Sequence, residues 1–159
     1  MSYFIGRLIC LLVLKTLFRI KVYGKENIPK RGAFILASNH TSFLDPLTLG
    51  VACPRKLNFM ARHDLFSNRL FSWLLTSWGV FPVKRGSADL SALKEAIQRL
   101  KDGEALLLFP EGSRGFEGAS FESQPGIGFL AAKVNVPVIP AFVKGTEIAL
   151  PKEAKFFKP

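Results

Sequence analysis

Short apolar runs alternate with segments of helical periodicity along almost the whole chain, and this alternation constrains the fold more than any other feature. The runs predict buried strands at residues 34–37, 57–61, 80–83, 105–109 and 138–143. Apolar residues at helical spacing predict helices at residues 4–18, 44–52, 68–78, 89–101 and 126–134. Because this alternation is typical of a parallel sheet covered by helices, we expect the 159 residues to form a single α/β domain with a largely parallel central sheet flanked by helices.

The end of the sequence departs from this pattern. Residues 144–159 contain no predicted helix or strand long enough to cap a sheet, and their last five residues are typical of the middle of a domain. We therefore expect a domain that is incomplete at its C-terminus.

The first twenty residues are mostly apolar, but Arg7, Lys15 and Arg19 interrupt them. The longest unbroken apolar run, at residues 8–14, falls far short of the roughly 18–20 residues that span a bilayer. On a helical wheel the three cations lie within about 120° of one another. This pattern predicts an amphipathic helix that lies in a membrane interface with its cations among lipid phosphates.

The domain organisation predicted from this segment is a membrane-interfacial helix at residues 1–21 followed by the folded domain at residues 22–159. A cleaved signal peptide is less favoured, because charges recur through the segment and no small-residue cleavage site follows. A helix packed on its own domain remains the alternative.

The chain carries a formal net charge of +10, from 22 Lys and Arg against 12 Asp and Glu. Such an excess favours a polyanionic partner, which can be an anionic membrane surface, a phosphorylated substrate or a nucleic acid. Nucleic acid is the weakest of these, since the cations form no basic-aromatic motif. The two cysteines, Cys10 and Cys53, provide neither a disulfide framework nor metal-ligand spacing.

One of the two histidines, His40, stands five residues before Asp45. Neutral imidazole is the usual general base near neutral pH, and a carboxylate can fix its tautomer. Five helical residues turn through about 500°, so the two side chains meet only if His40 precedes a helix and Asp45 lies in its first turn. The N-cap formers Asn39, Thr41 and Ser42 favour a helix start there. Alone, the pattern also fits a loop histidine and a helix-start acid.

Two further polar clusters each follow a predicted strand. Residues 109–115 place Glu111 and Arg114 on a tight, glycine-containing loop, and residues 79–87 place Lys84 and Arg85 beside glycine and serine. An arginine side chain at such a position suits a phosphate group. The second histidine, His63, lacks a comparable context, and we expect it in a surface loop.

In this order, the segments resemble the glycerolipid acyltransferase family typified by 1-acyl-sn-glycerol-3-phosphate acyltransferase. The family's H-x4-D motif matches residues 39–46, and its Gly-led strand ending in arginine matches residues 79–85. Its F-P-E-G-[ST]-R motif matches residues 109–114, and its Val-Pro-Val-Ile-Pro segment matches residues 136–140. The resemblance extends from about residue 22 to 151. Lys84 stands where the family frequently has aspartate.

The resemblance implies an acyltransferase of phospholipid biosynthesis that moves a fatty acyl group from acyl-CoA or acyl-carrier protein to the sn-2 hydroxyl of 1-acyl-glycerol-3-phosphate (lysophosphatidic acid), which gives phosphatidic acid. His40 would take the hydroxyl proton and Asp45 would orient His40. The residues implied in substrate binding are Arg85, Glu111, Gly112, Ser113 and Arg114. No cofactor or metal is expected, and the enzyme would be monotopic on the cytoplasmic face of a membrane, the inner membrane if bacterial.

Three alternatives remain at this stage. The acceptor can instead be glycerol-3-phosphate or another lysophospholipid, and Lys84 is one reason to consider this. The chain can also be a non-catalytic membrane-binding or lipid-binding module. Finally, the aromatic residues between 70 and 78 can line an acyl channel, although their helical spacing favours a place in the core.

Overall fold

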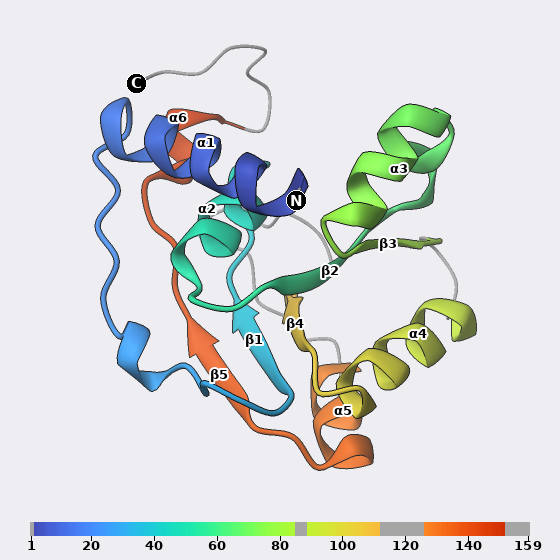
Figure 1. The fold of residues 1–159 in the computed structure, drawn as a ribbon. Coiled ribbons are helices and arrows are strands. Elements are labelled where there is room, and N and C mark those ends of the chain that lie inside the picture. The colour runs from blue at the N-terminus through green and yellow to red at the C-terminus, as the bar shows by residue number, and fades with distance from the viewer. Residues whose placement is uncertain (1, 85–88, 112–125, 152–159) are drawn as a thin grey trace.

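A five-stranded, all-parallel sheet organises the computed structural model, which describes residues 2–84, 89–111 and 126–151 (Figure 1). The strands are β1 (Phe34–Ser38), β2 (Leu57–Arg62), β3 (Val80–Val83), β4 (Ala105–Leu108) and β5 (Val138–Ala141). Their order across the sheet is β3-β2-β4-β1-β5. The parallel α/β sheet and all five strands are confirmed, with ends that differ by at most two residues from the prediction.

The helices of the described residues lie close to the predicted ones. They are α1 (Ser2–Thr16), α2 (Asp45–Ala52), α3 (Arg69–Ser77), α4 (Leu90–Lys101), α5 (Gly126–Val134) and α6 (Thr146–Ala149), with 3-10 turns η1 (Lys25–Asn27) and η2 (His63–Phe66). Asn68 and Asp89 start α3 and α4 by accepting backbone N–H bonds at their first turns. The four-residue α6 falls in a segment for which no element was predicted, since one turn is too short to show helical periodicity.

Helices cover both faces of the sheet, which explains why β4 and all of β1 except Ser38 are apolar. On one face Phe34 and Leu36 pack with Leu49 of α2. On the other face Ile35 and Leu106 pack with residues of α4 and α5. Figure 1 shows α1 and α2 on the first side and α4 and α5 on the second. The carboxyl ends of β1 and β4 are therefore fixed in place, because a buried core packs against each face of these strands.

The N-terminal helix α1 packs against α2. The Arg7 guanidinium donates to the carbonyl oxygens of Gly50, Val51 and Cys53 at 3.3, 3.1 and 2.8 Å. These carbonyls belong to the end of α2, where intrahelical donors run out. We expected Arg7 to lie among lipid phosphates. This expectation is wrong for Arg7, because its guanidinium caps the C-terminal end of α2.

The opposite side of α1 is apolar and open to solvent. Phe4, Ile5, Leu8, Ile9 and Leu12 are each more than half exposed. The helix thus packs on its own domain with one side and presents a largely exposed apolar side with the other. No helix of the described residues is long and apolar enough to cross a bilayer.

The core placement favoured for the aromatic run is wrong. No residue of α3 is buried, and Leu70 and Trp73 are more than half exposed. Helical spacing identified an apolar face of α3 correctly, but the spacing does not show whether the domain covers that face.

Candidate active site

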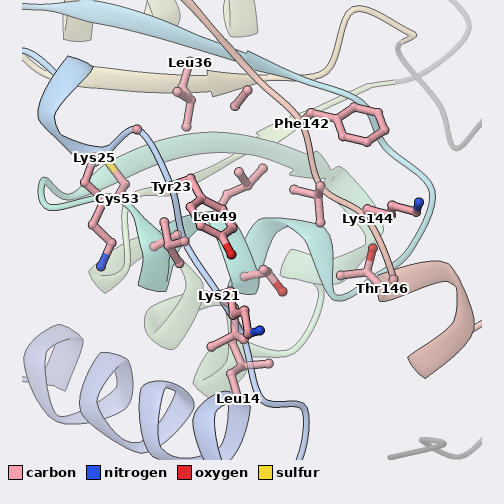
Figure 2. A pocket seen from close by; sticks show the side chains of 18 of the residues that line it. Leu14, Lys21, Tyr23, Lys25, Leu36, Leu49, Cys53, Phe142, Lys144 and Thr146 are labelled. Atoms are coloured by element: carbon pink, nitrogen blue, oxygen red, sulfur yellow. The ribbon is translucent and has the colours of Figure 1, made fainter.

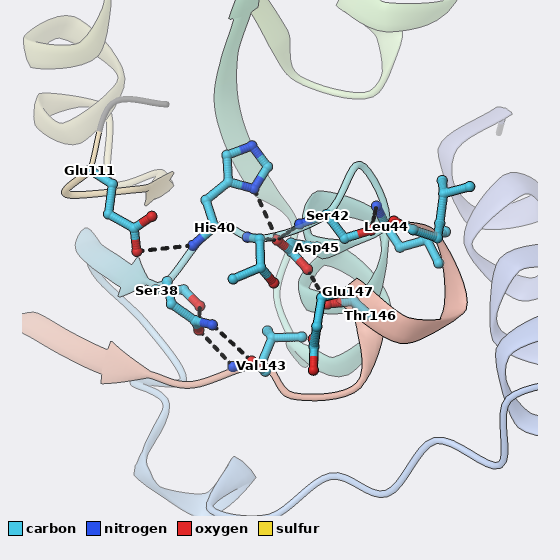
Figure 3. A network of polar contacts seen from close by, with 12 residues as sticks. Ser38, His40, Ser42, Leu44, Asp45, Glu111, Val143, Thr146 and Glu147 are labelled. Atoms are coloured by element: carbon cyan, nitrogen blue, oxygen red, sulfur yellow. Dashed lines mark hydrogen bonds and ion pairs between the residues drawn. The ribbon is translucent and has the colours of Figure 1, made fainter. Parts of the chain in front are cut away.

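The candidate site forms where β1 and β4 end side by side. The two strands are parallel neighbours, with Ala37 opposite Leu108, so the residues that follow them emerge at the same edge of the sheet. His40 follows β1 and Glu111 follows β4. The His40 backbone N–H donates to Glu111 Oε1 at 3.3 Å, which joins the first and third predicted motifs (Figure 3).

The His40 side chain is held on two sides. Its ring stacks on the Phe109 ring, with centroids 4.1 Å apart and an interplanar angle of 21°. Its Nδ1 atom lies 2.9 Å from Asp45 Oδ2. Only 15% of the side chain is exposed. The predicted arrangement is confirmed in its geometry, because His40 is in a non-helical segment and Asp45 is the first residue of α2.

The start of α2 differs in detail from the prediction. The expectation that Asn39, Thr41 or Ser42 is the N-cap residue is wrong, since the N-cap residue is Leu44 and makes no side-chain cap bond. Ser42 Oγ accepts the Leu44 N–H at 3.2 Å, just before the helix. Instead the Asp45 carboxylate reaches backward, and its Oδ2 accepts the N–H groups of Thr41 and Ser42 at 2.7 and 2.8 Å. The loop therefore folds around the carboxylate, which sets the position of Asp45 relative to His40.

The Asp45 side chain is fully buried. Burial alone raises the pKa of its carboxyl, but hydrogen bonds from His40, Thr146, Ser42 and Thr41 outweigh burial and lower this pKa below its ordinary value. An ionised carboxylate only accepts hydrogen bonds, so His40 Nδ1 must carry the proton that the two share. In the neutral imidazole Nε2 is then the unprotonated ring nitrogen, and it points away from Asp45 (Figure 3). This is the tautomer that a general base requires.

Residues 143–150, which are distant in sequence, form hydrogen bonds with the loop that carries His40. Asn39 exchanges two 2.8 Å hydrogen bonds with the backbone of Val143, and Ser42 Oγ donates to the Leu150 carbonyl at 2.9 Å. Thr146 Oγ1 donates to Asp45 Oδ1. Sequence reasoning missed this contact, because a single threonine in a one-turn helix gives no periodic signal and its partner is 101 positions away.

The other predicted site residues are not all placed. Arg85, Gly112, Ser113 and Arg114 lie outside the described residues. Lys84 is described, has an exposed side chain, and donates its backbone N–H to Asp89 Oδ2 at 2.8 Å. His63 is exposed as expected, but it begins the η2 turn.

A cavity of about 610 Å³ lies behind the site, between residues 18–28 on one side and α2, β5 and α6 on the other (Figure 2). Leu36, Leu49 and Cys53 contribute to its apolar wall, and Lys21 and Lys144 also line it. Thr48 and Thr146 line it as well, whereas His40 and Asp45 do not.

Comparison with known proteins identifies the family of the chain. A model of the family described as "Acyltransferase" matches residues 19–144. The chain is 35% identical over 127 residues to the 1-acyl-sn-glycerol-3-phosphate acyltransferase of Bacillus subtilis, covering 79% of this chain and 63% of that protein. It is 30% identical to the chloroplastic 1-acyl-sn-glycerol-3-phosphate acyltransferase LPAT1 of Arabidopsis thaliana, covering 94% of this chain and 42% of that protein.

A solved structure has the same fold. The 1-acyl-sn-glycerophosphate (LPA) acyltransferase PlsC of Thermotoga maritima superposes with a TM-score of 0.78 at 30% identity, covering 96% of this chain and 64% of that one. The chain thus spans less than two thirds of the length of each of these relatives. These matches confirm the resemblance seen in the motifs, and the chain belongs to the acyltransferase family.

Proposed function

We propose that this chain transfers a fatty acyl group from a thioester to the sn-2 hydroxyl of 1-acyl-glycerol-3-phosphate, with His40 as the general base and Asp45 as its orienting partner. The observation that carries the proposal is the 2.9 Å contact between His40 Nδ1 and the buried Asp45 carboxylate, in a family whose similar members are named for this reaction.

The chemistry follows from the free ring nitrogen. His40 Nε2 takes the proton of the acceptor hydroxyl as its oxygen attacks the thioester carbonyl carbon. The tetrahedral intermediate collapses when the carbon–sulfur bond breaks, and the proton passes from Nε2 to the departing thiolate. The products are phosphatidic acid and a free thiol, either CoA or acyl-carrier protein. Asp45 stabilises the imidazolium that forms, and no side chain is acylated.

The remaining substrate contacts are assigned through the motifs. Arg85 would bind the acceptor phosphate, and Glu111 and Arg114 would position the glycerol. Backbone N–H groups near Gly112 and Ser113 would stabilise the oxyanion of the tetrahedral intermediate. One described contact supports the role of Glu111. Its carboxylate accepts the His40 backbone N–H, so it lies next to the proposed base. Arg85 follows β3 in the sequence, and His40 follows β1. These two strands are three strand spacings apart in the sheet, or about 14 Å. The acceptor would therefore extend from the end of β1 to the end of β3.

A panel of donors and acceptors tests the proposal. The purified chain is incubated with acyl-CoA or acyl-carrier-protein thioester and with lysophosphatidate, glycerol-3-phosphate or lysophosphatidylethanolamine, and free thiol and acylated product are measured. We expect the highest kcat/KM with lysophosphatidate. A preference for another acceptor would support the alternative headgroup. Vesicle binding without turnover on any pair would instead indicate a non-catalytic lipid-binding module.

We also propose that the exposed side of α1 docks the domain on an anionic membrane surface, at the cytoplasmic face. Its support is the row of exposed apolar side chains on α1 and the net charge of +10. Such docking brings the site to substrates that carry acyl chains and avoids extracting them into water.

Replacing Leu8 and Leu12 by glutamate is expected to weaken binding to anionic phospholipid vesicles about 100-fold or more, because each buried leucine contributes roughly 1.5–3 kcal/mol. Co-sedimentation measures the effect. K101E is the matched control, since it makes the same change in net charge on α4. Equal losses in the two variants would show that α1 does not insert.

A further inference from the structure

Thr146 makes a contact that the proposed mechanism has not used. The residue is 8% exposed, and its hydroxyl donates to Asp45 Oδ1. The other oxygen, Oδ2, accepts from His40 Nδ1 and from the N–H groups of Thr41 and Ser42. Among the described residues Thr146 supplies the hydrogen bond to Oδ1, and no other does.

The division of donors between the two oxygens determines the orientation of the carboxylate. Three donors on Oδ2 fix the position of that oxygen, but they do not prevent the plane of the carboxylate from rotating about it. A donor on Oδ1 removes this freedom and keeps the Oδ2 lone pair directed at Nδ1. From this geometry we infer that Thr146 is a positioning residue for acyl transfer, which fixes the Asp45 carboxylate and through it the ring of His40. The inference rests on the function proposed above.

The surroundings of Thr146 are built to hold it. Gly145, with φ of 93°, is the N-cap residue of α6, and its N–H donates to both carboxylate oxygens of Glu147 at 3.0 and 2.9 Å. The end of α6 is attached to the same loop through Ser42 Oγ and the Leu150 carbonyl. Val143, just before α6, is paired with Asn39. The hydroxyl of Thr146 is thus presented to Asp45 by a segment anchored on both sides.

Thr48 provides a matched comparison. It lines the same cavity as Thr146 and also has a buried hydroxyl, but among the described residues this hydroxyl has no hydrogen-bond partner. A Thr→Val substitution removes a hydroxyl and keeps the shape of the side chain at both positions. Only at Thr146 does it also remove a hydrogen bond to a carboxylate.

The test compares kcat and KM of T146V, T146S and T48V with those of the wild-type chain, using the acceptor and donor that the wild type prefers. We expect T146V to lower kcat about tenfold with KM nearly unchanged, since the variant loses a hydrogen bond to a charged group and Thr146 is inferred to act through Asp45 rather than on the substrate. T146S keeps the hydroxyl and is expected within about twofold of the wild type. T48V is expected to match the wild type.

Three results would overturn the inference. They are a T146V rate equal to that of T48V, equal losses in T146V and T146S, and a loss expressed in KM alone. Melting temperatures of all variants are recorded, and T146A replaces T146V if the latter does not fold. A wild-type chain without activity on any substrate pair would contradict the proposed function itself, so the two failures can be told apart.

Discussion

Replacing His40 by alanine is expected to lower the rate of acyl transfer by roughly 10²–10⁴-fold. The substitution removes Nε2, the proton acceptor, while the Asp45 carboxylate keeps its bonds to Thr41, Ser42 and Thr146. The measurement is the initial rate of thiol release from acyl-CoA that depends on added lysophosphatidate.

The fold should survive this change, because His40 lies in the loop after β1 and belongs to neither buried core of the described residues, although its ring stacks on Phe109. The matched control is H63A, which removes the chain's other histidine from the exposed η2 turn. We expect H63A to retain the wild-type rate and both variants to retain the wild-type circular dichroism spectrum. An H40A variant as active as H63A would exclude His40 as the base.

Replacing Asp45 by asparagine is expected to lower the rate by about 10³-fold or more, as in other dyads and triads that lose the carboxylate behind a histidine. The amide presents a donor at one of two oxygen positions that now accept hydrogen bonds, so it opposes either Thr146 or the Thr41 and Ser42 N–H groups. It also allows the wrong tautomer of His40. Activity is measured as for His40, and a D45N rate within tenfold of the wild type would contradict this role.

The same substitution has an expected signature in acid. The folded protein lowers the pKa of Asp45, so its stabilising contribution is present above the unfolded pKa of about 4 and is lost as pH falls through the lowered folded pKa. The wild-type melting temperature should therefore exceed that of D45N at neutral pH, and the gap should narrow below about pH 4. Melting temperature against pH checks this. A gap that stays constant in acid would mean that the carboxylate is not stabilised as described.

The sequence predicted the sheet well because its signals are local. Five apolar runs of strand length, separated by helices with a clear period or a capping residue such as Asp89, leave few alternatives to a parallel α/β sheet. The contact between His40 and Asp45 was predictable for a related reason. The spacing excludes a common helix, and the geometry at a helix start is then the one that brings the two side chains together.

Other features depend on contacts that no local pattern encodes. The exposure of Trp73 and the capping of α2 by Arg7 are decided by which surfaces the domain happens to cover. The support of Asp45 by Thr146 joins residues 101 positions apart through a one-turn helix. Local periodicity gives the elements and the edge of the sheet at which chemistry collects, but the packing of β5 and α6 against the loop completes the site.

The most direct test of the central claim, that His40 and Asp45 act as one unit, is the single-turnover rate of the H40A/D45N double variant beside the two single variants. If Asp45 acts only through His40, the double variant should transfer acyl groups at a rate within about threefold of H40A. In H40A the imidazole that Asp45 orients is already absent, so the D45N change should have little further effect. If the rate losses of the two single variants multiply in the double variant, the residues act independently and the dyad is contradicted.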